Sequence, residues 1–415
     1  MSHVHQVLPR TLIRLAISLV LVCVATNSIA EEGKSYGRMD ADFRSFYFDR
    51  DKEDLPVSRA LTQALMLRYR SPYLQDVVSL NGSFFGNLKL FGKDGEGGTD
   101  LLQDEPDGSQ KSYAKLAEVF ASFKLPLESR MDVGRMELIA PLLNDPDYRA
   151  TPTTSQGFSL RTKYNGVIGY LAGSNKGSAY TDPEFRSYTD DRGESFDIYT
   201  AGLEFEVANG LYLHGAFGQA DNVMDQVYFN ARYPWEISNK LGFLVDAYHY
   251  SGRANGEGAL LEVGPEYRSS LSNVALRVIG DSSVLTFSLQ TVNGDDYRTS
   301  WDGERNDHTS YFSWQSVQRL NFDRANEDSW QLRFDYDLKN MARGLHIMAR
   351  YISGDNITRD DGLTGSEWER DIDFIYQPPG IRNLTLRWRN AAVRSTETFD
   401  SNENRLIVNY SIQAF

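Results

Sequence analysis

The sequence predicts an all-β chain that forms a transmembrane antiparallel up-and-down β-barrel of about 18 strands. Three observations carry this prediction: apolar and polar residues alternate with a period of two, aromatic residues and glycine are abundant, and short and long connections follow one another. The chain holds 23 Tyr, 22 Phe and 33 Gly but only 13 Pro among its 415 residues. This composition suits many strands joined by turns, and it supplies the aromatic girdles of a membrane barrel.

The alternation is clearest in SWQLRFDYDL, Ser329 to Leu338. Its Trp, Leu, Phe and Tyr side chains fall on one face of a strand, and its Gln, Arg and Asp side chains fall on the other. The pattern recurs in segments of about ten residues, the length that a tilted strand needs to cross a bilayer. The further segments are Val78–Leu90, Glu118–Leu125, Thr200–Val207, Leu345–Tyr351, Leu384–Arg389 and Arg405–Gln413. The alternation is poor in Met131–Met136 and in Arg253–Tyr267.

Connections of two kinds separate these segments. Asn165-Gly166 and Asn209-Gly210 are hairpin signals, because both residue types tolerate positive φ. Other short connections are predicted at Ser71–Asp76, Pro126–Arg130, Pro234–Asn239, Gly280–Ser282, Lys339–Arg343 and Pro378–Arg382. Long polar connections are predicted at Gly92–Lys111, Glu137–Ser155, Ser174–Ser195, Val292–Asp328 and Gly354–Glu367. Short turns on one rim and long loops on the other are typical of outer-membrane barrels, and an even strand number leaves both termini on the short-turn rim.

The first residues are typical of an export signal. Arg10 and Arg14 precede the apolar run Leu15–Ala25, which is too short to span a bilayer as a helix. Small residues at Ser28 and Ala30 predict cleavage before Glu31, so residues 1–30 form the signal and residues 31–415 the barrel. The only cysteine, Cys23, leaves with the signal. The mature chain is therefore predicted to contain no disulfide and no thiolate metal site.

Charge and motifs exclude several classes of function. A net charge of −14 argues against nucleic acid as a partner. No G-x-S-x-G elbow, H-E-x-x-H pair or Gly-rich phosphate loop occurs, so neither an enzyme nor a cofactor is predicted. After the signal no long apolar run remains, which excludes helical membrane spans. The acidic stretch Asp94–Asp107 has no ordered ligand spacing and is interpreted as an outer loop.

Several stretches resemble the OprD family of substrate-specific outer-membrane porins. They are FRSFYFDRD (Phe43–Asp51), RMELIAPLLNDPDYRATPTTSQGF (Arg135–Phe158), VNGDDYR (Val292–Arg298), EDSWQLRFDYDL (Glu327–Leu338), LTLRWR (Leu384–Arg389) and NENRLIVNYSI (Asn402–Ile412). The resemblance implies an 18-stranded barrel in which the third loop folds inward. It also implies a narrow eyelet with a ladder of arginines on one wall and acids and tyrosines on the other. The solutes that it implies are small and carry carboxylates, although some relatives take up sugars or oligosaccharides.

Side-chain parity gives candidate residues for the arginine ladder. Guanidinium groups stay charged and hold a carboxylate through two parallel hydrogen bonds. The candidates are Arg387 and Arg389 on one predicted strand, Arg405 on the next, Arg333 and Arg350 on earlier strands, and Arg149 in the third-loop match. The alternative is that these arginines only pair with lumenal acids, namely Asp335, Asp337, Asp371 and Asp373.

Candidates for the acidic wall lie in the long segment after Val292. They are Asp295, Asp296 and Asp307, which could receive the ammonium group of an amino acid or could belong to a solvated outer loop. Glu137, Asp145 and Asp147 in the third-loop match leave the same two alternatives open.

The sequence therefore predicts a passive, substrate-selective uptake channel in the outer membrane of a Gram-negative cell. Its expected partners are outer-membrane lipid and lipopolysaccharide, together with small anionic or zwitterionic solutes, and it could be a monomer or a homotrimer. Two alternatives from other classes stay open. One is a barrel enzyme such as a lipase, for which His249 near the apolar face could pair with a serine. The other is a soluble or surface-attached β-rich binding protein.

Overall fold

The computed structural model describes residues 37–207, 209–257, 264–301, 311–339, 341–359 and 361–414. The predicted signal peptide and its cleavage site lie outside this part of the chain, and both stay predictions. Asp307 of the predicted acidic wall also lies outside it. No helix in the described ranges is long and apolar enough to cross a membrane.

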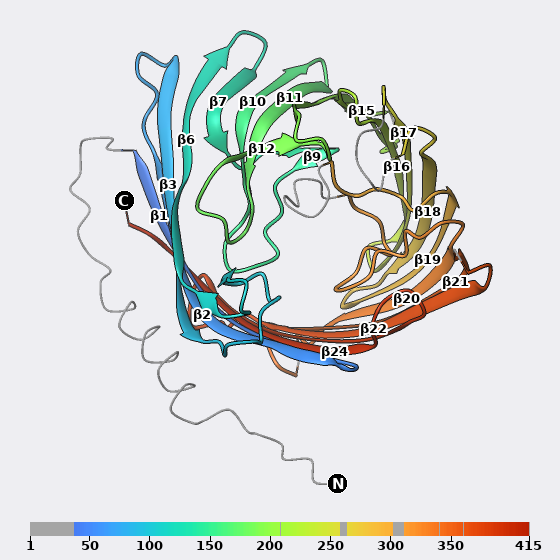
Figure 1. The fold of residues 1–415 in the computed structure, drawn as a ribbon. Helices are drawn as coiled ribbons and strands as arrows, with labels where there is room; N and C mark the ends of the chain where they lie inside the picture. The colour runs from blue at the N-terminus through green and yellow to red at the C-terminus, as the bar shows by residue number, and fades with distance from the viewer. Residues whose placement is uncertain are drawn as a thin grey trace.

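The described chain is built of strands, and 18 of them close into an antiparallel barrel, as the sequence predicts (Figure 1). The barrel strands are β1 (Arg38–Lys52), β2 (Leu55–Arg70), β3 (Val78–Phe91), β6 (Tyr113–Leu125), β7 (Ser129–Met136), β10 (Thr154–Tyr164), β11 (Val167–Ser178), β14 (Ile198–Glu206), β15 (Tyr212–Ala220), β16 (Met224–Ser238), β17 (Leu241–Ala254), β18 (Arg268–Ile279), β19 (Ser283–Gly294), β20 (Asp328–Asp337), β21 (Leu345–Thr358), β22 (Thr364–Tyr376), β23 (Leu384–Ser395) and β24 (Ser401–Gln413). Three small hairpins lie in the connections: β4 (Gln103–Asp104) with β5 (Gln110–Lys111), β8 (Ile139–Ala140) with β9 (Leu143–Asn144), and β12 (Arg186–Thr189) with β13 (Ser195–Phe196).

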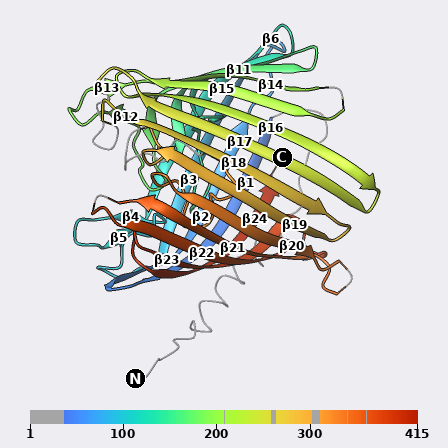
Figure 2. The ribbon, with the colours of Figure 1, turned by 90° about the vertical axis from the view of Figure 1, so that its right-hand side faces the viewer.

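Pairing of the first strand with the last closes the barrel. In this ladder Phe43 of β1 lies opposite Tyr410 of β24, while the other edge of β1 pairs with β2. Neighbouring strands elsewhere pair in chain order as hairpins, and Figure 2 shows them inclined to the barrel axis. Closure leaves no exposed sheet edge, which a strand within lipid could not tolerate.

The outer face of the barrel is apolar, as the alternation predicts. On β20, Leu332 and Phe334 are each 47% exposed, whereas Gln331 on the inward parity is fully buried. The same contrast recurs around the wall. Large apolar side chains exposed on the outside include Leu80, Leu88, Leu116, Leu203, Phe217, Val274, Leu289 and Leu406. These side chains can only be stable against hydrocarbon, so the alternation reflects lipid outside and polar groups inside.

The predicted turns are confirmed at the two Asn-Gly hairpins, where Asn165 has φ 49° and Asn209 has φ 78°. The prediction of a turn at Pro234–Asn239 is wrong. Strand β16 continues through Pro234 to Ser238, and the connection is Asn239 and Lys240. Proline is tolerated there because β15 begins at Tyr212, opposite Arg232, and leaves the remainder of β16 unpaired on that side.

Loop lengths follow the predicted asymmetry only in part. Every connection on the rim that holds the termini is short. The opposite rim carries the long connections, but it also has tight ones, including residues 53–54 between β1 and β2 and 221–223 between β15 and β16. The predicted long connection Gly354–Glu367 shrinks to residues 359–363, since both flanking strands extend further than the alternation indicates. The segment Met131–Met136, where alternation is poor, is a strand within β7.

The buried core lies inside the barrel. The connection between β7 and β10, residues 137–153, runs into the lumen and carries the β8–β9 hairpin (Figure 1). Its Leu138, Leu142 and Leu143 are almost fully buried among inward-facing aromatic residues. The largest cluster also contains Tyr188, Phe196, Tyr228, Tyr250, Tyr297 and Trp301. This largest cluster packs against the inward faces of β14, β15, β16, β17 and β18.

Candidate functional site

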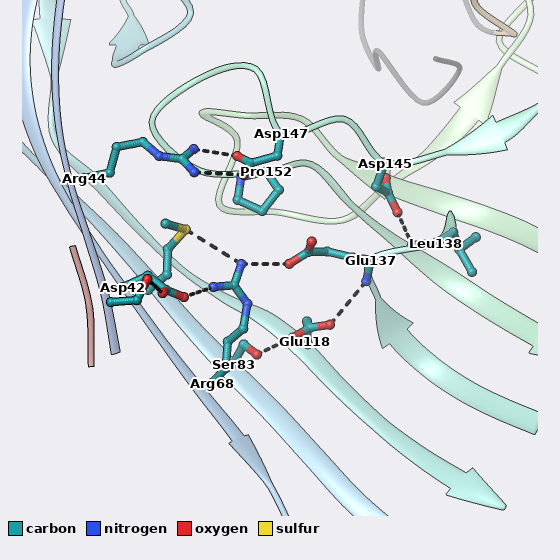
Figure 3. A network of polar contacts seen from close by, with 12 residues as sticks. Asp42, Arg44, Arg68, Ser83, Glu118, Glu137, Leu138, Asp145, Asp147 and Pro152 are labelled. Atoms are coloured by element: carbon teal, nitrogen blue, oxygen red, sulfur yellow. Dashed lines mark hydrogen bonds and ion pairs between the residues drawn. The ribbon is translucent and has the colours of Figure 1, made fainter. Parts of the chain in front are cut away.

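The inward loop of residues 137–153 is held to strands β1 and β2 by two arginines (Figure 3). The guanidinium of Arg44 donates to both carboxylate oxygens of Asp147, at 2.5 and 2.8 Å, and to the carbonyl of Arg149 at 2.7 Å. Arg68 donates to Glu137 at 3.0 Å. Bidentate charge-assisted contacts of this kind fix orientation as well as position. The inward course implied by the family resemblance is thus confirmed, and its anchors come from the first two strands.

The far end of this loop is fixed to strand β14 and to Trp301 in the connection after β19. The indole Nε1 of Trp301 donates to the carbonyl of Leu142 at 2.5 Å, and the hydroxyl of Thr200 on β14 donates to the carbonyl of Pro141 at 2.9 Å. Within the loop, Asp145 accepts from the backbone N–H of Leu138 at 2.7 Å. Hydrogen bonds therefore hold the loop on both sides of the lumen.

Described parts of a second inward loop, residues 295–301 and 311–327 of the connection between β19 and β20, also contact the inside of the barrel, and the sequence does not reveal this. Its inner part is held by polar side chains that point inward from the wall. Glu369 on β22 accepts from the backbone N–H groups of Arg319 at 3.0 Å and Leu320 at 2.8 Å. Gln290 on β19 donates to the carbonyl of Phe322 at 2.7 Å, and Gln331 on β20 donates to that of Trp314 at 2.5 Å.

The arginines that line β23, β24 and β1 outnumber the acids that they contact. Glu403 on β24 is fully buried and is shared by three arginines: Arg405 at 2.5 Å, Arg50 at 2.6 Å and Arg319 at 3.9 Å. Arg50 comes from β1, and Arg319 from the second inward loop. One carboxylate cannot neutralise three guanidinium groups, so this part of the wall is positive.

Arg387 and Arg389 extend the same positive wall on β23. Both contact a single acid, Asp373 on β22; the Nε of Arg387 lies 2.9 Å and that of Arg389 3.4 Å from its Oδ2. Arg389 also lies directly opposite Arg405 in the β23–β24 ladder. The side chain of Arg387 is 34% exposed and that of Arg389 is 18% exposed, so both remain accessible from the lumen.

The other predicted ladder residues are more fully paired. Arg350 is buried and bonds Asp371 at 2.6 Å, and Arg333 donates twice to Asp335 at 2.7 Å. Arg149 in the inward loop bonds Asp100 at 3.0 Å. The structure thus brings Arg387, Arg389 and Arg405 together, and it places Arg333, Arg350 and Arg149 in separate ion pairs around them.

The predicted acidic residues lie at the rim that carries the long loops. Asp295 accepts from the backbone N–H of Arg268 at 2.8 Å, and Asp296 accepts from that of Ala325 at 2.7 Å. They line a depression of about 1250 Å³ together with Tyr267, Tyr297, Arg298, Asp323, Arg324, Arg359 and Glu397. Two further acids, Glu137 and Asp147 of the inward loop, are each paired with an arginine of β1 or β2.

Sequence reasoning missed Arg44, Arg50, Arg319 and Glu403. The first two lie in FRSFYFDRD, where aromatic residues occupy both faces of the strand, so parity alone is ambiguous. Phe46 and Phe48 are buried inside the lumen beside them. Arg319 lies in a loop, where parity carries no information. Glu403 lies two residues before Arg405 on the same strand, and this spacing was the signal that could have placed it on the lumenal face.

Burial raises the pKa of the Glu137 carboxyl to about 7, reinforced by the negative charges of Glu118 and Asp147 and opposed by Arg68. Glu137 lies in the loop, outside the membrane-spanning strands. Below pH 7 it is mostly neutral, and of the two acids that form ion pairs with Arg68 among the described residues, only Asp42, at 2.5 Å, then remains charged. We therefore expect the anion-to-cation permeability ratio to rise about twofold as the pH falls from 8 to 6. Reversal potentials in a KCl gradient measure this ratio.

The control for this pH dependence is Glu137→Gln, which is neutral at both pH values. It should already show the higher ratio at pH 8, and its ratio should change less between pH 8 and 6. Asp323, whose pKa burial raises to about 7, titrates in the same range in both proteins. An identical pH response in wild type and variant would assign the effect to Asp323 instead and contradict the prediction.

A serine and a histidine do meet on the outer face of the barrel. His249 on β17 is exposed to the outside, and its Nδ1 lies 2.9 Å from the hydroxyl oxygen of Ser272 on β18. Within the described ranges no side chain orients the other ring nitrogen, as a catalytic histidine requires. Nor do the described residues contain a cluster of His, Asp and Glu that could hold a metal ion.

A closed β-barrel with an apolar outer face and ion-paired side chains lining its lumen defines a class of protein, the outer-membrane channel of the porin type. The chain belongs to the OprD family: the family model described as outer membrane porin, OprD family, matches residues 36–414. Porin D of Pseudomonas aeruginosa is 27% identical in an alignment of 413 positions that covers 90% of this chain and 90% of that one. The protein is therefore a substrate-specific channel of the outer membrane and not an enzyme.

Solved structures of similar proteins agree with this fold. OccK9 (OpdG) of Pseudomonas aeruginosa superposes with a TM-score of 0.82 at 26% identity, covering 92% of this chain and 100% of that one. OpdK of the same organism, crystallised with vanillate, has a TM-score of 0.80 at 24% identity over 91% and 98% of the two chains. OccAB2 of Acinetobacter baumannii has a TM-score of 0.82 at 22% identity over 92% and 100%.

Proposed function

We propose that the protein is a passive channel for small carboxylate-bearing solutes, such as amino acids and aromatic or other organic acids. The supporting observation is the shared use of two acids by five arginines. Glu403 serves Arg405, Arg50 and Arg319, and Asp373 serves Arg387 and Arg389. Arg387 and Arg389 present this excess positive charge to the lumen with side chains that are 34% and 18% exposed, and the low dielectric behind them strengthens the attraction of an anion.

The two inward loops make this attraction selective. Arg319 is held by Glu369 through its own backbone, so its guanidinium enters the cluster from the lumen side. Arg44 and Arg68 hold the first inward loop beside the same region. A solute therefore meets fixed donors rather than flexible lysines, and a bidentate carboxylate fits guanidinium geometry better than a spherical anion does.

The rim supplies a complementary charge for zwitterions. The Asp296 side chain stays 52% exposed although its carboxylate accepts from the backbone of Ala325 and from the guanidinium of Arg324 at 3.1 Å, and Asp295 lies beside it. We propose that these two acids meet the ammonium group of an amino acid at the entrance, before its carboxylate reaches the arginine wall. No energy-coupling element is needed, because the gradient of the solute drives its passage.

The similar structure of OpdK contains vanillate, an aromatic carboxylate, which fits this proposal. The test is planar-bilayer recording with benzoate, acetate, glutamate, arginine and maltose on the same purified protein. We expect the carboxylates to interrupt the ionic current at millimolar concentration and maltose to leave it unchanged. Block by maltose without block by any carboxylate would overturn the proposal in favour of a sugar channel.

A further inference from the structure

Arg277 on β18 is an inward arginine to which the described chain offers no carboxylate within ion-pair distance. Its guanidinium carbon lies 4.9 Å from the ring centroid of Trp314, which the second inward loop brings over it. Its Nε is shielded from solvent and has no hydrogen-bond partner. The guanidinium of Arg277 is half-buried and stacked on an indole but has no anion beside it, so some of its N–H groups are free to bind a solute.

The acids nearest to Arg277 are already engaged by other donors. Asp246 on β17 accepts from Asn230 at 2.8 Å, from the Tyr248 hydroxyl at 3.1 Å and from the Trp314 indole at 3.3 Å. Asp335 on β20 accepts twice from Arg333 at 2.7 Å. These contacts engage both carboxylates, and in the described chain neither forms an ion pair with Arg277.

An exposed aromatic ring lies beside this arginine. Phe312 is 49% exposed, yet the Tyr250 hydroxyl fixes its backbone, donating to its carbonyl at 2.9 Å and accepting from its N–H at 3.2 Å. Its ring centroid lies 5.3 Å from that of Tyr248 and 5.6 Å from that of Trp314. An apolar ring held open to a water-filled passage is unfavourable unless something apolar covers it.

The strand register places Arg277 at the periplasmic end of an oblique row of inward-facing residues on neighbouring strands. Arg277 lies opposite Thr286, which lies opposite Arg333, which lies opposite Arg350. Arg277 is two residues from Ile279, where β18 ends at the short-turn rim. Because the strands are inclined, the row descends across the wall, and its last arginine lies nearest the periplasm.

We propose that Arg277, Trp314 and Phe312 form a second, exit-side subsite for carboxylates that carry a flat apolar group such as an aromatic ring. Arg277 donates hydrogen bonds to the carboxylate, and the ring of the solute packs on Phe312. A solute that leaves Arg387 and Arg389 thus meets one more anchor before the periplasm. This subsite rests on the proposed function and adds to it a preference for aromatic over aliphatic acids.

The test compares benzoate with acetate as current blockers of wild type, Arg277→Ala and Phe312→Ala. In Arg277→Ala the half-blocking concentration of benzoate should rise about tenfold, the effect of one charge-assisted hydrogen bond. In Phe312→Ala it should rise about threefold for benzoate and not for acetate, the effect of one ring contact. Retained heat-modifiable mobility on gels shows that each variant barrel is folded.

The matched control is Arg232→Ala. Arg232 on β16 also points inward and stacks on an aromatic ring, 4.7 Å from Tyr212; Asp246 lies opposite it in the ladder, but no acid of the described residues forms an ion pair with it. Its loss should change the benzoate value less than twofold. Equal effects of Arg232→Ala and Arg277→Ala, or an equal loss of benzoate and acetate block in Arg277→Ala, would overturn the subsite and leave the proposed function intact. A wild-type channel that no carboxylate blocks would overturn the proposed function instead.

Discussion

Replacing Arg387 and Arg389 together by alanine is expected to raise the half-blocking concentration of benzoate and acetate roughly thirtyfold. Each charge-assisted hydrogen bond contributes about 1.5–3 kcal/mol, and partial solvent exposure reduces this value. The two arginines share Asp373, so their loss also leaves that carboxylate facing the passage uncompensated. Single-channel recordings with each carboxylate measure the change, and the anion-to-cation permeability ratio should fall in the same experiment.

The matched control for this double variant is Arg130→Ala with Arg161→Ala. These two arginines lie opposite each other in the β7–β10 ladder and point into the lumen from another wall, where each contacts an acid of its own. Removing them deletes the same net charge from the channel. A comparable loss of carboxylate block in the control would mean that net charge alone governs selection, against a specific role for Arg387 and Arg389.

Replacing Glu369 by alanine is expected to raise the open-channel conductance about twofold and to weaken discrimination among carboxylates. Its carboxylate accepts the backbone N–H groups of Arg319 and Leu320, so its loss leaves two buried donors unsatisfied, at about 1–3 kcal/mol each. The segment around Arg319 and Leu320 should then detach from the barrel wall, which moves the Arg319 guanidinium away from Glu403. Conductance in 1 M KCl and the ratio of benzoate to acetate block measure both effects.

Glu367 provides the control for Glu369. It lies two residues away on β22, is equally buried on the same face, and bonds the Ser395 hydroxyl at 2.9 Å rather than the backbone of the inner loop. Glu367→Ala should therefore leave the conductance near the wild-type value. Unchanged conductance in Glu369→Ala would show that Gln290 and Gln331 suffice to hold the loop, and the predicted role of Glu369 would be wrong.

Side-chain parity was sufficient to predict which face of most strands each residue occupies. Arg387, Arg389, Arg405, Arg333 and Arg350 all point inward as predicted, and Leu332 and Phe334 point outward. A strand has only two faces and the outer one must match hydrocarbon, so period two carries this information locally. The turn at Pro234 was mispredicted because tolerance of proline depends on where the neighbouring strand begins, which no local pattern records.

The pairing of charges could not be read from the sequence. Arg50 and Glu403 are 353 positions apart and meet only because the first strand pairs with the last. Which arginines remain under-compensated depends on how many others reach the same acid. That number includes Arg319, delivered by a loop whose inward course depends on Glu369, Gln290 and Gln331 on three separate strands.

By itself the sequence determined the barrel, its oily exterior and the set of ionic side chains inside it, because these follow from the two-residue repeat of a strand between two solvents. Only the tertiary structure decided which of those charges are shared, which are neutralised and where the loops narrow the passage. The physical reason is that ion pairing is a contact between distant segments. Its strength depends on distance and burial, and both are set by barrel closure and loop packing rather than by any neighbouring residue.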